Sequence, residues 1–135
     1  MITAVDTNVL IDIVRADETF GLRSLDAVRR CVQEGQIVAC DVVWTEFSAI
    51  FASPQVFEKA LRSLPLVFSP TDKQSAVLAG DMWRQYRKQG GERNRVVADF
   101  LVASHAIRQA DRLLTRDRGF YRKYFKNLKL IDPSV

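Results

Sequence analysis

Short, apolar, β-favouring runs alternate with helix-forming segments along the whole chain. The predicted strands cover residues 2–5, 36–40, 66–68, 112–115 and 128–131. Between them lie segments whose apolar residues recur at helical spacing. Because strands that alternate with helices pair in parallel through right-handed crossovers, this pattern predicts an α/β fold with helices on both faces of the sheet.

Residues that favour helix ends set boundaries for the first predicted helices. Thr7-Asn8 opens the first helix. Ser24 is expected to cap the second, which Gly35 ends. Asp41 is expected to cap a third helix that runs from Val42 to about Ala52.

Three more helices are predicted further along the chain. Ser53-Pro54 begins one of them, since proline suits the first helical position, and Leu64-Pro65 ends it. Ser69-Pro70 begins a long helix that Gly90-Gly91 terminates, and the last helix covers residues 99–110.

Composition excludes several classes of protein. The chain has 135 residues, of which 47% are hydrophobic and 27% charged, as expected of one folded domain with an apolar core. No apolar run is long enough to cross a membrane, and the first residues lack a signal sequence, so we expect a cytoplasmic protein. Two separated cysteines and one histidine leave little material for a zinc site or a histidine-based triad.

The net charge of +4 conceals an uneven distribution. Residues 1–83 contain 7 basic and 11 acidic side chains, whereas residues 84–135 contain 13 basic and 5 acidic side chains. The basic second half is suited to contact with a polyanion. A solvated basic surface is the alternative interpretation.

Two carboxylates follow predicted strands. Asp6 comes directly after the first strand, and Asp117 follows the fourth, beside Thr115. Ligands of open parallel sheets bind at the carboxyl ends of the strands, so both acids face the usual position of a site. A helix N-cap at Asp6 and an ordinary polar turn at Asp117 are the structural alternatives.

Glu46 is expected on an apolar face of a helix. At about 100° per residue, its neighbours on that face are apolar: Val42, Val43, Ala49 and Ile50. A buried carboxylate is costly unless it is paired or bound to a metal ion, so a site is favoured over a buried salt bridge.

Asp99 repeats this pattern on the last predicted helix. Its neighbours on the helix are small or apolar: Val102, Ala103, Ala106 and Ala110. Such small residues allow the helix to approach the sheet closely, which places Asp99 near the strand ends. An N-cap at Asp99 is the alternative.

Four carboxylates that converge in one crevice would repel one another unless cations neutralised them. Oxygen ligands of this kind suit Mg²⁺ or Mn²⁺, which activate water and stabilise the leaving oxygen of a phosphodiester. The chain has no glycine-rich phosphate loop, which disfavours nucleoside-triphosphate chemistry. The acids therefore predict metal-dependent hydrolysis of a phosphodiester.

Four segments carry a resemblance to a known family. They are DTNVLID at 6–12, WTEF at 44–47, ADFLVASHA at 98–106 and LTRDRGF at 114–120. In this order and spacing they resemble a PIN-domain ribonuclease, and more narrowly a VapC-type toxin of a type II toxin–antitoxin system. The resemblance covers essentially the whole chain.

The resemblance implies a fold, an activity and a site. The fold is a PIN-like three-layer α/β/α arrangement with a mostly parallel sheet of four to five strands, and residues 1–135 form a single PIN domain. The activity is that of a metal-dependent endoribonuclease, with Mg²⁺ or Mn²⁺ as cofactor. Asp6 and Asp99 are the central metal ligands, Glu46 and Asp117 complete the acidic cluster, and Asn8 and Thr115 orient these groups.

The resemblance also implies partners. They are an RNA substrate, a small VapB-like antitoxin that blocks the acidic groove, and a second copy in a homodimer. A non-catalytic RNA- or protein-binding module and a structure-specific DNA nuclease are the alternative functions.

Basic and aromatic residues near the acids are candidates for contact with RNA. The basic candidates, which would hold the RNA backbone, are Arg93, Arg95, Arg116 and Arg118. The aromatic candidates, which could instead belong to the core, are Phe120, Tyr121, Tyr124 and Phe125.

Overall fold

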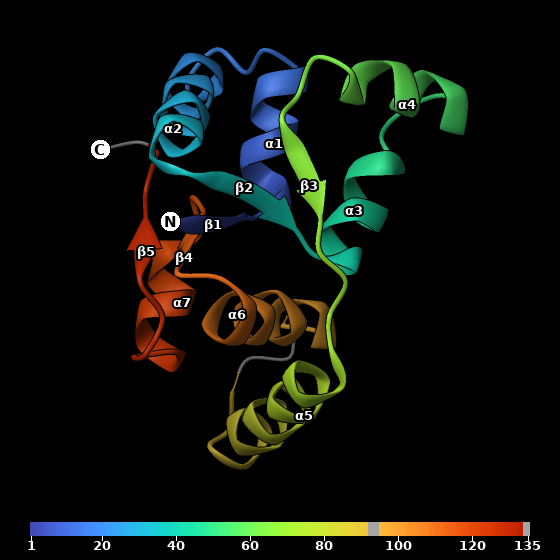
Figure 1. Ribbon diagram of the computed structural model, residues 1–135. Coiled ribbons are helices and arrows are strands. Elements are labelled where there is room, and N and C mark those ends of the chain that lie inside the picture. Colours follow the sequence, from blue (N-terminus) through green and yellow to red (C-terminus); the bar gives the residue numbers. More distant parts are fainter. Residues whose placement is uncertain (92–94, 134–135) are drawn as a thin grey trace.

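The computed structural model describes residues 1–91 and 95–133 and has a parallel sheet at its centre (Figure 1). The strands are β1 (Ile2–Val5), β2 (Gln36–Ala39), β3 (Leu66–Phe68), β4 (Arg112–Leu114) and β5 (Leu130–Ile131). They pair in the order β3-β2-β1-β4-β5, and every pair is parallel. The predicted parallel sheet of four to five strands is therefore confirmed.

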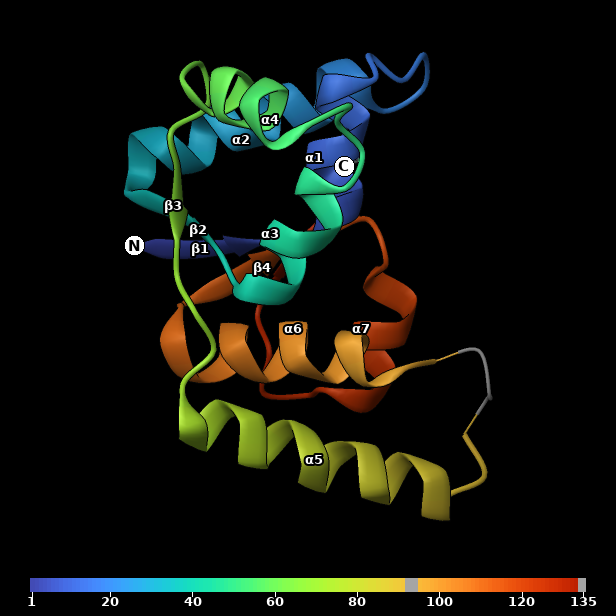
Figure 2. The same cartoon turned by 90° about the vertical axis from the view of Figure 1, so that its right-hand side faces the viewer.

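Seven helices lie in the described residues. They are α1 (Thr7–Val14), α2 (Gly21–Glu34), α3 (Asp41–Ser48), α4 (Pro54–Leu61), α5 (Lys73–Lys88), α6 (Val97–Gln109) and α7 (Arg118–Tyr124). In Figure 2, α1 and α2 lie on one side of the sheet, and α6 and α7 lie on the other, with α5 outside α6. These layers confirm the predicted three-layer α/β/α fold. No helix in residues 1–91 and 95–133 has the length and apolar character needed to cross a membrane.

Several helix boundaries differ from the predicted ones. Ser24 does not cap α2, which begins at Gly21, and it is instead buried within the helix, where its hydroxyl donates to Asp12. The helix can begin earlier because Gly21 packs closely on the preceding turn, where a Cβ would lie 3.1 Å from the carbonyl carbon of Ala16. Gly35 ends α2 as expected, and an added Cβ there would lie 1.9 Å from the carbonyl oxygen of Met1.

The α3 and α5 helices are shorter than predicted. Asp41 lies in the first turn of α3 rather than at its N-cap, because its carboxylate accepts hydrogen bonds from the amide and hydroxyl of Thr71. The same helix ends at Ser48 instead of continuing to Ala52. The long helix begins only after Asp72, whose carboxylate caps it by accepting from the amide of Ser75 at 2.7 Å.

Candidate active site

The register of the sheet brings the ends of β1 and β4 together. Val5 is aligned with Leu114, and the amide of Asp6 donates to the carbonyl of Leu114 at 2.9 Å. The next residues along each strand, Asp6 and Thr115, are therefore neighbours although they are far apart in the sequence. Strand pairing alone thus places the first acid beside the loop that carries Asp117.

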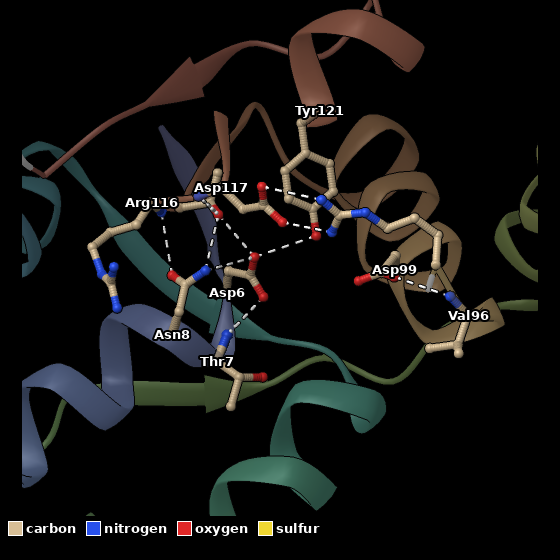
Figure 3. Close-up of polar contacts among 10 residues, drawn as sticks. Asp6, Thr7, Asn8, Val96, Asp99, Arg116, Asp117 and Tyr121 are labelled. Carbon is tan, nitrogen blue, oxygen red and sulfur yellow. Dashed lines mark hydrogen bonds and ion pairs between the residues drawn. The ribbon is translucent and has the colours of Figure 1, made fainter. Parts of the chain in front are cut away.

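Asp6 is held by four hydrogen-bond donors (Figure 3). Its Oδ1 accepts from the amide of Thr7 at 2.8 Å, which makes Asp6 the N-cap of α1. Its Oδ2 accepts from the Thr115 hydroxyl at 2.8 Å, the Tyr121 phenol at 3.3 Å and the Asn8 side-chain amide at 3.4 Å. The structural alternative, a helix N-cap at Asp6, is therefore confirmed, and the same carboxylate also accepts from three side chains.

Burial raises the pKa of Asp6 from 3.8 to about 6. Hydrogen bonds from Thr115, Thr7 and Tyr121 lower this pKa, and the negative charge of Glu46 raises it again. Burial outweighs the hydrogen bonds because the side chain is only 9% exposed. A cation beside this carboxylate would favour its ionised form and so offset the cost of burial.

Asp117 forms an ion pair with Arg95. The Arg95 Nη1 lies 2.7 Å from Asp117 Oδ2, and Nη2 lies 3.5 Å from Oδ1. The guanidinium also stacks over the ring of Phe120, with 4.0 Å between its central carbon and the ring centroid. The amide of Asp117 donates to the Thr115 hydroxyl at 3.0 Å, so Thr115 connects Asp117 to Asp6.

Asp99 lies at the start of α6, half-buried. It is the third residue of the helix rather than its N-cap, and its Oδ2 accepts from the amide of Val96 at 3.2 Å. Figure 3 shows its carboxylate on the side of α6 that faces Tyr121 and Asp6. The charges of Asp6, Asp99 and Asp117 all contribute to raising the pKa of Tyr121, after burial as the main cause, so the three acids surround this phenol.

Glu46 is exposed, and the prediction that it projects from a buried apolar face is wrong. The buried side of α3 is formed by Val43 and Phe47, and the helix ends before Ala49 could extend that face. The Oε1 of Glu46 accepts from the Thr7 hydroxyl at 2.8 Å. Because the amide of Thr7 also donates to Asp6, Glu46 still lies at the edge of the same cluster.

The two predicted orienting residues lie in the cluster. Asn8 bridges α1 and the loop after β4, since its Oδ1 accepts from the amide of Arg116 at 3.2 Å and its Nδ2 reaches Thr115 at 3.5 Å. Thr115 is fully buried and donates to Asp6. Their contacts suit the orientation of a carboxylate, and their catalytic role stays a prediction.

The described arginines of the predicted RNA-binding set are each paired with an acid of this chain. Arg95 pairs with Asp117, and Arg118 pairs with Asp132 at 3.0 Å. Arg93 lies outside the described residues. The remaining arginine, Arg116, pairs with Asp12 and is the most firmly held of the three.

Arg116 forms a two-point ion pair with a nearly buried acid. Its Nε and Nη2 lie 2.5 Å and 2.9 Å from the carboxylate oxygens of Asp12, whose side chain is 5% exposed. The guanidinium also lies over the ring of Phe20 at 4.2 Å. This pair ties the loop that carries Thr115 to α1, so Arg116 has a structural role that the sequence did not indicate.

Tyr121 lies among the candidate site residues, whereas the sequence suggested only stacking on RNA or a place in the core. It lies on α7, a helix that was not predicted, and its phenol donates to Asp6 while the ring is buried. The available signal was its position four residues after Asp117, which places both on one face of a helix.

The donor types of this cluster suit a hard divalent cation, because all four acids offer oxygen atoms only. Within the part of the chain that the structure describes, no three His, Cys, Asp or Glu side chains are yet grouped closely enough to hold a metal ion. Two of the acids are engaged elsewhere, Asp117 with Arg95 and Asp99 with Val96. The residues therefore fit such an ion chemically, provided that these two carboxylates turn toward Asp6.

Comparisons with known proteins agree with the fold. The family model described as PIN domain matches residues 3–126. The structure is similar to that of VapBC2 from Rickettsia felis bound to a DNA fragment from their promoter, with a TM-score of 0.75 and 17% identity over 98% of both chains. It is similar to VapBC-1 from nontypeable Haemophilus influenzae, with a TM-score of 0.72 and 18% identity over 100% of both chains.

A third similar structure is a toxin-antitoxin complex from Klebsiella pneumoniae, with a TM-score of 0.66 and 14% identity over 97% of both chains. At these identities the likeness concerns the fold alone. No curated protein matches the sequence.

Proposed function

The chain belongs to the PIN-domain family, whose members are generally nucleases, and from that premise we propose that it is a metal-dependent endoribonuclease. We further propose that it is the toxin of a toxin–antitoxin pair. The observation that carries the proposal is Asp6, a buried carboxylate at the strand ends that Thr7 and Thr115 link to Glu46 and Asp117. Burial of the ionised carboxylate is costly, and a bound cation would offset that cost.

In this proposal Asp6 and Asp99 hold the ion, and Glu46 and Asp117 complete its surroundings directly or through water. The ion is Mg²⁺ or Mn²⁺, and when bound it supplies an activated water and stabilises the leaving oxygen of the phosphodiester. Thr115, Tyr121 and Asn8 fix the orientation of Asp6 through their hydrogen bonds to its Oδ2. Preorganised ligands of this kind reduce the reorganisation that binding requires.

Arg95 has two roles in this proposal. In the described structure it neutralises Asp117, whose carboxylate would be available to a cation once that pair opened. The released guanidinium, which is already near Asp99, is then available to a phosphate of the RNA. An arginine is well suited to this exchange, because carboxylate and phosphate oxygens match the same planar donors.

We also propose the partners that the family resemblance implies. A small VapB-like antitoxin would cover the acidic groove, and a toxin-antitoxin complex among the similar structures supports this proposal. A homodimer is proposed on the resemblance alone. A cytoplasmic location accords with two buried cysteines that form no disulfide.

The test uses purified wild-type protein and the variants Asp6→Asn and Asp99→Asn. We expect wild type to cleave RNA with Mg²⁺ or Mn²⁺ and to lose activity in EDTA, and each variant to lose at least about a hundredfold in rate. Asp26→Asn, an exposed acid on α2, is the matched control and should retain activity. Equal cleavage by wild type and both variants would refute the mechanism.

The substrate class is tested with RNA and DNA of the same sequence. Preferential cleavage of DNA would support the structure-specific DNA nuclease. RNA binding that persists in EDTA, with no cleavage under any divalent ion, would support a non-catalytic binding module.

A further inference from the structure

A groove of about 450 Å³ lies where α5, α6 and α7 meet, and none of the four candidate acids lines it. Buried aromatic rings form part of its floor, among them Tyr86 and Phe100. These two rings lie 5.3 Å apart and pack on α7 through Phe120. The floor is therefore preformed by the core of the domain.

The rim of the groove carries two lysines, Lys123 and Lys126, both exposed. Across the described ranges 1–91 and 95–133, neither forms an ion pair with a carboxylate. The acid on the opposite wall, Asp81, is already bonded to Arg84 and Gln85. The two lysines thus give the groove positive charge that no acid of the groove neutralises, unlike the paired arginines near the catalytic acids.

The groove is also lined by side chains of the kinds that bind nucleic-acid bases. The half-exposed ring of Tyr124 lies at the edge of the groove, with Lys123 Nζ 5.3 Å from its centroid. The side-chain amides of Gln85, Gln89 and Asn127 line the groove and can both donate and accept hydrogen bonds. An aromatic face, amides and cations together are how proteins bind unpaired nucleotides of RNA.

The groove and the acidic cluster share two helices, α6 and α7. Phe100 of its floor follows Asp99 directly in the sequence, and the Phe120 ring contacts Arg95 at 4.0 Å and Tyr124 at 5.4 Å. Tyr121 and Tyr124 lie on the same helix, about 4.5 Å apart along its axis. Each of these helices therefore contributes to both sites, since α6 carries Asp99 and Phe100 and α7 carries Tyr121 and Tyr124.

We infer that this groove binds an unpaired nucleotide of the RNA that flanks the cleaved phosphodiester. Its base stacks on Tyr124 and meets the amides, and its phosphates contact Lys123 and Lys126. A second copy of the chain or an acidic peptide is a poorer match, because neither presents an unpaired base to the Tyr124 ring and the side-chain amides. The inference rests on the proposed function and adds to it a binding position for one nucleotide at the junction of α5, α6 and α7.

The test measures the affinity for short single-stranded oligouridine and oligoadenine in EDTA, over a range of salt concentrations. The double variant K123Q/K126Q should bind more weakly, and the slope of log affinity against log salt should decrease in magnitude by about 1.4, or about 0.7 for each lysine–phosphate pair removed. K59Q/K73Q, which removes two exposed lysines outside the groove, should leave the slope unchanged.

Two variants of Tyr124 test the stacking face. Tyr124→Leu should lose about tenfold in affinity with no change in salt slope, whereas Tyr124→Phe should bind as wild type does. Circular dichroism and thermal unfolding identify any variant that fails to fold. Tyr124→Phe keeps the aromatic ring and its packing, so a loss of affinity in Tyr124→Leu alone is due to loss of the ring.

The outcomes separate this inference from the proposed function. If wild type cleaves RNA while the lysine and tyrosine variants bind and cleave normally, the groove inference is wrong and the nuclease stands. A changed oligomeric state of K123Q/K126Q with unchanged RNA affinity would also overturn it. If wild type neither binds nor cleaves RNA, the proposed function itself fails.

Discussion

Arg95 Nη1 lies 2.7 Å from Asp117 Oδ2, so a cation of the chain itself neutralises one of the four acids. The pair is partly exposed, with 25% of the Arg95 side chain and 37% of the Asp117 side chain accessible, and it is therefore exchangeable. In the proposed mechanism a divalent ion would compete with this guanidinium for the same carboxylate.

The first prediction follows from that competition. Arg95→Gln should bind Mg²⁺ or Mn²⁺ more tightly than wild type, by about threefold to tenfold, since Asp117 no longer has to leave a partner. Titration calorimetry without RNA measures this affinity. Arg84→Gln, which removes an Arg–Asp pair on α5, is the matched control and should have no effect. Weaker metal binding by Arg95→Gln would contradict the competition.

The second prediction concerns the pH dependence of stability. The pKa of Asp6 is raised from 3.8 to about 6 in the folded protein, so between these values the folded state binds the proton and the unfolded state does not. Stability therefore falls as pH rises through this window, and the ionised carboxylate costs up to about 3 kcal/mol above pH 6 when no cation is bound. Below the unfolded-state pKa of 3.8 this cost is absent, because both states bind the proton.

Asp6→Asn isolates this effect. The difference in free energy of unfolding between Asp6→Asn and wild type should move in favour of the variant by up to about 3 kcal/mol between about pH 4 and pH 7. Urea unfolding in EDTA measures it, and other titrating groups cancel in the difference. Saturating Mg²⁺ should reduce this difference in free energy of unfolding. A difference that stays constant with pH would rule out the raised pKa of Asp6.

Much of the fold follows from local sequence pattern. Apolar runs that end in a polar residue predicted all five strands, and their parallel pairing then placed Asp6 next to the loop after β4. The strands follow from the apolar pattern of a few neighbouring residues, and their parallel pairing follows from the alternation of strands with helices. Asp117 and Thr115 could thus be assigned to the sheet edge from the sequence alone.

Other parts of the site depend on contacts that no local pattern contains. The Asp12–Arg116 pair joins residues 104 positions apart, so the sequence around either residue does not predict the pairing. Glu46 was expected to be buried because a longer helix was assumed, and the end of α3 at Ser48 changes its exposure. The role of Tyr121 was missed because its hydrogen bond to Asp6 joins residues 115 positions apart.

The third prediction concerns that buried pair. Arg116→Met leaves the nearly buried carboxylate of Asp12 without a counter-charge, which should cost about 3 kcal/mol of stability. D12N/R116M should recover part of this loss, since it removes both charges. Urea unfolding measures both, and Arg29→Met in the exposed pair with Asp26 should cost under about 1 kcal/mol. Equal costs for Arg116→Met and Arg29→Met would contradict the structural role of Arg116.

The last prediction tests the phenol of Tyr121 as a positioning group for Asp6. Its hydrogen bond to Oδ2 at 3.3 Å lowers the pKa of Asp6, so Tyr121→Phe should raise that pKa further above 6. The substitution removes one oxygen from a buried ring and leaves the aromatic packing in place.

At a pH near 6 a smaller fraction of Asp6 is then ionised, so metal-dependent cleavage should slow by about threefold there and recover toward about pH 8. The pH–rate profile measures this shift, with Tyr124→Phe on the same helix as the control. A purely structural role would lower the rate equally at every pH. A profile that keeps its midpoint, or moves to lower pH, would therefore show that Tyr121 does not act through Asp6.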